Sequence, residues 1–145
     1  MADGNGMTPR QRVLHACEQR GKPQLVAGCV ALLEGRDADP GLIVVLGGEP
    51  AGYVLAGHEG GPHGHWPRIW AARGLLHAWD DDATPAIIAA TTDDAWRVRE
   101  MAAKVIARHR VGDALPAVTA LRDDPVPRVR AAATRAMTAI TESAA

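Results

Sequence analysis

The sequence predicts an all-α protein, a right-handed α-solenoid of about five to seven helices in stacked antiparallel pairs. Three observations support this prediction. Alanine, the best helix former, is the commonest residue and phenylalanine is absent, while 47% of the residues are hydrophobic. The second half of the chain contains an internal repeat. Within each copy of that repeat, apolar residues follow one another at helical spacing.

The repeat has a period of 31 residues. Four residue types recur at that offset, namely Pro85 and Pro116, Asp93 and Asp124, Val98 and Val129, and Arg99 and Arg130. Each copy is predicted to be a helix, a tight turn at the aspartate and a second helix, with proline in the first turn of the first helix. Thr84 is predicted to be the N-cap of the earlier copy. Each pair has too little apolar surface to fold alone, so the pairs are expected to stack.

A degenerate copy precedes the two clear ones, because Pro67–Ala72 resembles Pro127–Ala132. We expect its second helix over 67–79 and its first over 40–46, capped by Asp39. A single domain is predicted over residues 1–145. It begins with an N-terminal helical cap (1–36), with helices at 8–19 and 23–33, and continues with the degenerate repeat (37–80), whose Gly-, Pro- and His-rich insertion loop (47–65) holds a short helical turn near Tyr53. Two repeats (81–112 and 113–140) and a frayed tail (141–145) follow.

On these residues the chain resembles the HEAT-repeat family, close to its short, phycobilin-lyase-like subtype. A repeat of that family carries proline in the first helix, aspartate in the turn and a Val-Arg pair in the second helix. The resemblance is strongest over residues 84–140; in the degenerate copy Trp70 replaces the arginine and Gly64 stands at the turn position. It implies a binding scaffold and a structural ladder that ties successive repeats together, formed by Asp93, Arg99, Asp124 and Arg130.

A basic stripe is the candidate binding surface. Arg68, Arg97 and Arg128 occupy one position on three successive second helices, and further basic residues follow two turns later. Tryptophans at the mouths of these helices are candidate anchors, although they also suit the gaps that small alanines leave between helices. The alternative is a solvated face with a Glu100–Lys104 pair at i, i+4. The predicted partner-binding residues are Arg68, Arg97, Lys104, Arg128, Arg135, Trp66 and Trp96.

Other motifs are interpreted structurally. His58, His63 and His65 are weak metal candidates, but their spacing matches no known site, so no metal is predicted. The segment Ile43–Gly52 imitates a strand leading into a phosphate-binding loop, yet it has no Gly-Lys-Ser/Thr, and a helix ending at its glycines is expected. His15, His77 and His109 are expected to be packing residues.

No catalytic constellation and no cofactor are predicted. Cys17 and Cys29 show neither Cys-x-x-Cys nor metal spacing, and we expect two buried structural thiols. Met1 to Thr8 is polar and glycine-rich without a hydrophobic signal core, and no stretch has the apolar length of a membrane span. A cytoplasmic protein is therefore expected.

The leading functional hypothesis is a non-catalytic protein-interaction scaffold whose basic concave face takes a partner segment bearing carboxylates. A second hypothesis is binding of nucleic-acid phosphates along the same stripe; a third, from the resemblance alone, is a lyase or chaperone for a prosthetic group. The net charge of −1 creates no general attraction to nucleic acid or anionic membranes, but residues 97–135 hold nine basic and four acidic residues. The identity of the partner and the oligomeric state stay open.

Overall fold

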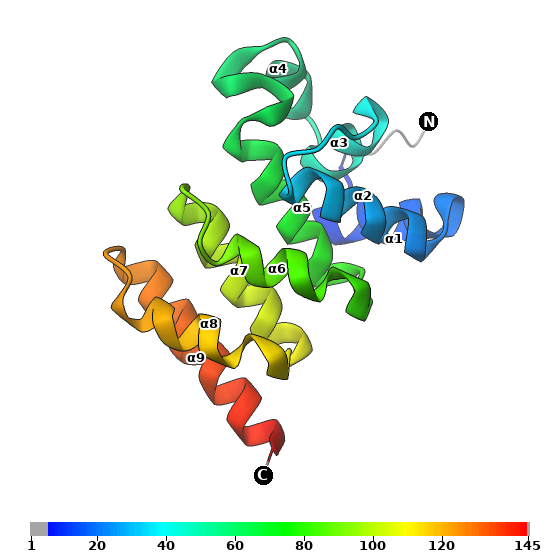
Figure 1. Ribbon diagram of the computed structural model, residues 1–145. Helices are drawn as coiled ribbons and strands as arrows, with labels where there is room; N and C mark the ends of the chain where they lie inside the picture. Colours follow the sequence, from blue (N-terminus) through cyan, green and yellow to red (C-terminus); the bar gives the residue numbers. More distant parts are fainter. Residues whose placement is uncertain (1–5, 145) are drawn as a thin grey trace. The chain divides into compact units, whose positions relative to one another are not determined.

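The computed structural model describes residues 6–144, and all regular structure in that range is helical (Figure 1). The all-α prediction is confirmed. The α-helices are α1 (Pro9–Arg20), α2 (Lys22–Leu33), α3 (Pro40–Gly47), α4 (Ala51–Leu55), α5 (His65–His77), α6 (Thr84–Ala90), α7 (Trp96–His109), α8 (Leu115–Ala120) and α9 (Pro127–Ala144). Short 3₁₀ helices are η1 (His58–His63), η2 (Asp81–Ala83), η3 (Gly112–Ala114) and η4 (Leu121–Asp123). Among residues 6–144 the α-helices outnumber the expected five to seven, and four of them, α3, α4, α6 and α8, have eight residues or fewer.

The chain divides after Asp80 into two compact units, which are described separately. In the first unit α5 packs against α1, α2 and α3, and α1 also contacts α2 and α3. α1 begins with a capping box in which the Thr8 hydroxyl accepts from the Gln11 amide and the Gln11 side chain accepts from the Thr8 amide. Asp39 caps α3, as predicted, by accepting hydrogen bonds from the amides of Gly41 and Leu42.

The segment 47–65 holds more helix than a loop. α4 contains Tyr53, where a helical turn was expected, and η1 follows it. The helix expected over 67–79 is α5, which begins and ends two residues earlier, at His65 and His77. Gly64 is its N-cap residue, with extended backbone and no side-chain hydrogen bond, so α5 starts directly from the end of η1.

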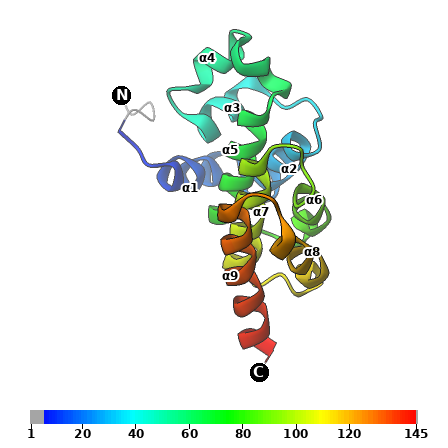
Figure 2. The same ribbon diagram turned by 90° about the vertical axis from the view of Figure 1, so that its left-hand side faces the viewer.

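The second unit consists of two helix pairs, α6 with α7 and α8 with α9. α7 and α9 pack side by side along much of their length, as both views show (Figures 1 and 2). Thr84 is not the N-cap of α6, in contrast to the prediction, but its first residue. The reason is that η2 runs straight into α6, so Ala83 at the N-cap position is already helical and has no side-chain oxygen to offer. η3 leads into α8 in the same way.

The ends of the chain differ from the prediction in one respect. α9 continues through Ala144, so the predicted frayed tail is helical over 141–144, where the Thr141 hydroxyl donates to the Met137 carbonyl. Residues 1–5 and residue 145 lie outside the described residues. Residues 1–5 form most of the stretch, Met1 to Thr8, in which no hydrophobic signal core was found. Between residues 6 and 144, no helix combines the length and apolar character needed to cross a bilayer.

The two cysteines of the first unit are both free thiols. Cys29 is buried, as predicted, with 1% of its surface exposed, whereas Cys17 is only partly buried. Burial, and secondarily the neighbouring Cys17, raises the pKa of Cys29 to about 12. Burial also raises the pKa of Cys17, against the opposing charge of Lys22. Because the thiolate is the reactive form, Cys29 is protected both by its pKa and by the lack of access.

We therefore expect one thiol of the native protein to react with an aromatic disulfide reagent at about pH 8, and both thiols to react in denaturant. The thiol count by absorbance measures this directly. A Cys17→Ser variant is the control and should show almost no reaction until it unfolds. Two rapidly reacting thiols in the native protein would contradict the burial of Cys29.

Candidate functional site

The starts of α7 and α9 are built by the same turn. The Asp93 carboxylate accepts a hydrogen bond from the Ala95 amide at 2.8 Å, and the Asp124 carboxylate accepts one from the Val126 amide at 2.9 Å. These contacts lie one repeat apart, so the two aspartates have the same structural role in successive repeats. Each satisfies an amide at the beginning of a second helix, which fixes where that helix and its basic residues start.

The arginines of the predicted ladder hold these turns. Arg99 Nη1 donates to the Asp93 carbonyl at 2.8 Å, and Arg130 Nη1 donates to the Asp124 carbonyl at 2.7 Å. Arg99 also reaches into the next repeat, where its Nε lies 2.7 Å and its Nη2 3.3 Å from the two carboxylate oxygens of Asp124. The structure thus brings all four residues into one chain of contacts, and the Arg99–Asp124 ion pair links the two repeats.

This ion pair is largely removed from solvent, since the Arg99 and Asp124 side chains are 15% and 5% exposed. Burial by itself raises the pKa of Asp124. The hydrogen bonds from Arg99 and the Val126 amide, together with the charges of Arg99 and Arg130, outweigh that effect and hold the pKa below its ordinary value. Asp124 is therefore ionised at neutral pH, and Arg99 is its ion-pair partner.

Glu100 is a buried carboxylate, whereas the alternative interpretation of the basic stripe puts it on a solvated face. It is 6% exposed, and Arg128 from α9 grips it with two hydrogen bonds, Nε to Oε2 at 3.0 Å and Nη2 to Oε1 at 3.2 Å. Lys104 Nζ lies 3.7 Å from the same carboxylate, so the anticipated i, i+4 pair exists. The packing of α9 against α7 buries Glu100, and no periodicity within one helix indicates that burial.

Trp96 lies beneath two guanidinium groups. The Cζ atoms of Arg97 and Arg128 are 4.4 Å and 5.2 Å from the centre of its ring. The ring also packs against a buried cluster formed by Ala103, Leu121, Val129, Ala132 and Ala133. Trp96 therefore fills a gap between helices, as the structural interpretation of the tryptophans expects. It also contacts two surface cations, which suits their interpretation as binding anchors.

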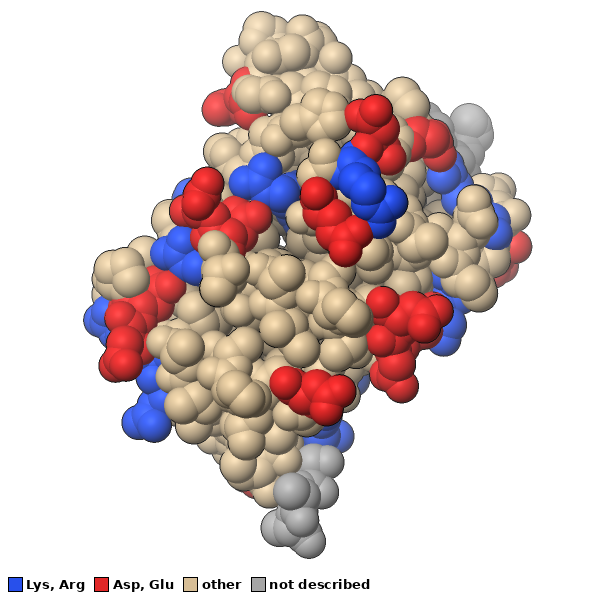
Figure 3. Space-filling view, viewed as in Figure 1, with Lys and Arg blue, Asp and Glu red and all other residues tan. Residues whose placement is uncertain are grey.

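These residues define the α7–α9 surface, which consists of Trp96, Arg97, Glu100, Lys104, Arg128 and Arg135. Arg128 remains 65% exposed although it pairs with Glu100, and Lys104 is 39% exposed. Arg97 and Arg135 are exposed as well. On the face of the molecule in Figure 3, acidic and basic side chains are interspersed. Within the α7–α9 surface itself, Glu100 pairs with Arg128 and Lys104, so the attraction of this surface for an anion acts over a short range.

Arg68 and Trp66 belong to α5 in the first unit. Arg68 Nη1 donates to the His63 carbonyl at 3.2 Å, at the end of η1. The Trp66 ring is tilted against His65 and Trp70, with ring centres 5.1 Å and 6.4 Å apart. Both predicted site residues therefore lie in the first turn of α5, beside the histidine segment.

The three candidate metal-binding histidines have separate neighbours. His58 stacks on Tyr53 with ring centres 4.0 Å apart, and His63 Nε2 lies 3.0 Å from an Asp37 carboxylate oxygen. His65 contacts Trp66. Over residues 6–144, no group of three or more His, Cys, Asp or Glu side chains is arranged to hold a metal ion.

Comparison with known proteins identifies a family model described as HEAT repeats, which matches residues 66–138. The match covers half of the chain and does not single out the phycobilin-lyase-like subtype. No curated protein and no solved structure matches the chain.

Proposed function

Since the chain belongs to the HEAT-repeat family, we propose that it is a non-catalytic protein-interaction scaffold whose α7–α9 surface binds an acidic segment of a partner protein. HEAT repeats generally mediate protein interaction, and stacked helix pairs use extended surfaces to do so. The family supports the general role; the location and chemistry of the binding surface are argued from this chain's own residues.

The observation that carries the proposal is the arrangement of Arg97 and Arg128 over Trp96. An aromatic ring flanked by arginines is the composition found at the energetic centres of protein interfaces. Arg128 is held in place by Glu100 through Nε and Nη2, so its remaining N–H groups keep a fixed direction. A guanidinium that is already oriented loses less side-chain entropy when a carboxylate binds.

A protein partner suits this surface better than nucleic acid. Glu100 neutralises part of the charge of Arg128 and Lys104. Binding of a phosphate backbone gains most of its free energy from a row of unneutralised cations. A short acidic segment can bind through ion pairs with only two or three cations, while an apolar side chain of the segment packs against the Trp96 ring.

The test is a charge reversal that spares the Glu100 pair. A glutamate at position 128 would lie against the buried Glu100 carboxylate, so the chosen variant is Arg97→Glu with Arg135→Glu. We expect it to bind its partner at least about tenfold more weakly than wild type, because two attractive charges become repulsive. The partner is isolated by affinity purification with and without nuclease, and its Kd is then measured by calorimetry.

The matched control is Arg108→Glu with Arg122→Glu, which changes the net charge equally at exposed positions outside the α7–α9 surface. It should bind like wild type. If both double variants lose affinity equally, a general charge effect and not this surface is responsible. A ligand that disappears on nuclease treatment, with affinity that falls steeply with salt, would instead establish phosphate binding.

A further inference from the structure

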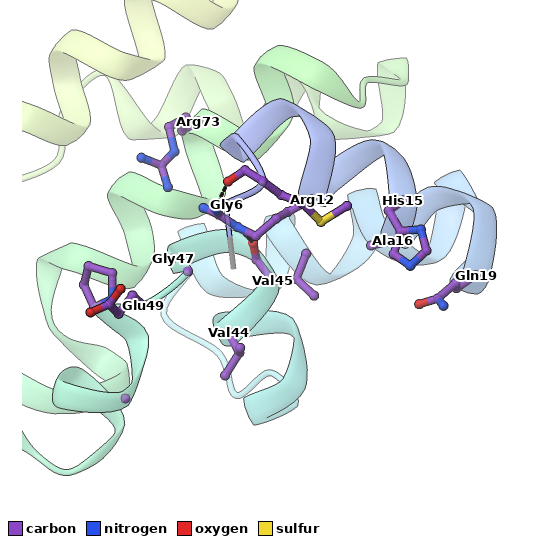
Figure 4. Close-up of a pocket in the computed structure, with 14 residues that line it drawn as sticks. Gly6, Arg12, His15, Ala16, Gln19, Val44, Val45, Gly47, Glu49 and Arg73 are labelled. Atoms are coloured by element: carbon purple, nitrogen blue, oxygen red, sulfur yellow. Dashed lines mark hydrogen bonds between the residues drawn. The ribbon is translucent and has the colours of Figure 1, made fainter. Parts of the chain in front are cut away.

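Two arginines of the first unit meet at the C-terminal end of α3. Arg12, from α1, donates from Nε to the Val45 carbonyl at 2.8 Å and from Nη1 to the Met7 carbonyl at 2.9 Å. Arg73, from α5, donates from Nη2 to the Leu46 carbonyl at 2.7 Å. Figure 4 shows the two side chains approaching this end from different helices. The packing of α1 and α5 against α3 therefore brings two positive charges to the same helix end.

The backbone is shaped to admit Arg12. Gly48, which ends α3 with φ of +71°, lies so close that a Cβ atom there would be 2.9 Å from Cζ and Nη2 of Arg12. A side chain at this position would both strain the backbone and displace the guanidinium. Gly48 thus leaves the space that the Arg12 guanidinium occupies.

No carboxylate among residues 6–144 forms an ion pair with either arginine, although Glu49 lines the same cavity. Burial, and secondarily the charge of Arg12, lowers the pKa of Arg73, and burial lowers that of Arg12. The carbonyls at the end of α3 compensate only part of this charge. Two partly buried cations without a carboxylate partner among residues 6–144 are an arrangement that a bound anion would stabilise.

Both guanidinium groups retain donors for such an anion. Arginine has five N–H groups, and the contacts above use two of Arg12 and one of Arg73. In the described part of the chain, no buried side-chain nitrogen or oxygen lacks a hydrogen-bond partner. The nitrogen atoms without a partner among residues 6–144, such as Arg12 Nη2, are therefore not fully buried, and both arginines line the cavity. Capping of α3 explains the two hydrogen bonds to the Val45 and Leu46 carbonyls, and the third holds the Met7 carbonyl before α1; the other donors are left unexplained.

The cavity beside these donors has a volume of about 1070 Å³. Binding sites for small molecules reach roughly 300–1,000 Å³, so there is room for one. Its lining is mixed: Arg12 and Arg73 supply charge, while Ala16, Val44 and Val45 supply apolar surface (Figure 4). Val44 is a large hydrophobic residue that is nevertheless 47% exposed, and an apolar group of a ligand would cover it.

We propose that this cavity is a binding site for a small organic oxyanion, in which Arg12 and Arg73 hold a carboxylate or phosphate group and Val44 and Val45 contact the apolar body of the ligand. The planar guanidinium matches both oxyanions with two parallel N–H groups. The site is independent of the α7–α9 surface, since it uses other residues in the other unit of the chain.

The test uses hexyl phosphate, hexanoate, inorganic phosphate and hexanol as probes, with calorimetry on the whole chain. Wild type is expected to bind hexyl phosphate or hexanoate saturably, with Kd in the millimolar range or below, and hexanol not at all. The preferred head group distinguishes a phosphate ligand from a carboxylate. Weaker binding of inorganic phosphate supports a role for Val44 and Val45, whereas equal binding would overturn that part of the proposal.

Arg73→Gln is expected to weaken binding at least about tenfold, because one of the two guanidiniums is lost while a polar side chain is kept. Arg10→Gln is the matched control, since Arg10 is an exposed arginine of α1 outside the cavity. Arg73→Lys keeps the charge without the paired N–H groups and should fall between wild type and Arg73→Gln. Circular dichroism shows whether each variant is folded.

Two outcomes would overturn the proposal. One is the absence of saturable binding of both organic probes by wild type up to about 10 mM. The other is equal weakening by Arg73→Gln and Arg10→Gln, which would show that only net charge matters. If Arg73→Gln does not fold, the comparison of Arg73→Lys with Arg10→Gln decides in the same way.

Discussion

Asp124→Ala is expected to lower the free energy of unfolding by about 3–5 kcal/mol, which is the usual cost of removing one partner of a buried ion pair. The variant leaves the Arg99 guanidinium with 15% of its side chain exposed and no carboxylate beside it. It also removes the acceptor of the Val126 amide at the start of α9. The loss therefore combines an uncompensated charge with a disrupted turn.

Urea unfolding followed by far-UV circular dichroism measures the effect, as a lower midpoint with an unchanged slope. Asp123→Ala is the matched control, because it makes the same chemical change one residue away at an exposed position, and we expect a change within about 0.5 kcal/mol. Equal losses in the two variants would mean that the Arg99–Asp124 pair contributes nothing specific.

The same ion pair has a defined dependence on pH. The pKa of Asp124 is lower in the folded protein than the ordinary value of about 3.9 for an unfolded chain. Its contribution to stability is therefore fully present above that unfolded value and is lost as the pH falls through the folded pKa. The stability difference between wild type and Asp124→Asn should accordingly be constant near neutral pH and shrink in acid.

Gly47→Ala is expected to destabilise the first unit by about 2 kcal/mol, since overpacking of a core typically costs 1–3 kcal/mol. A Cβ atom on Gly47 would lie 2.5 Å from Cε3 and 2.6 Å from Cζ3 of Trp70. The ring is 5% exposed and belongs to α5, so it has little freedom to move aside. The closeness of α3 and α5 thus depends on the absence of a side chain at position 47.

Gly52→Ala makes the same substitution where a Cβ would meet nothing within 4 Å, on the exposed face of α4. We expect it to be neutral or to stabilise by about 0.5 kcal/mol, because alanine restricts the unfolded chain. Urea unfolding of both variants, with tryptophan fluorescence as a second signal, compares them. Stabilisation by Gly47→Ala would show that α3 and α5 are farther apart than described.

The features of this protein that the sequence predicts are those specified by residues close together in the chain. The 31-residue offset identified helix pairs, turn aspartates and the equivalent positions of Arg99 and Arg130, because each is specified within a few residues. Local reasoning was wrong at Thr84, where the choice of cap depended on η2 continuing into α6. α9 extends to Ala144, past residue 140, where the last repeat was expected to end.

The candidate sites show the same division. Sequence position indicated Arg97, Arg128 and Trp96 as a group, but not that Arg128 grips a buried Glu100 or that two guanidiniums lie over one ring. No motif connects Arg12 with Arg73, which are far apart in the chain and meet only because α1 and α5 both pack against α3.

The amino-acid sequence by itself determined the helical class, the repeat and its turn chemistry, because helix propensity, capping and apolar periodicity act over a few residues. Only the tertiary structure decided which charges are buried, which are paired and which are left facing a cavity. Burial and pairing depend on which surfaces different helices present to each other, and that information is spread over residues distant in the chain.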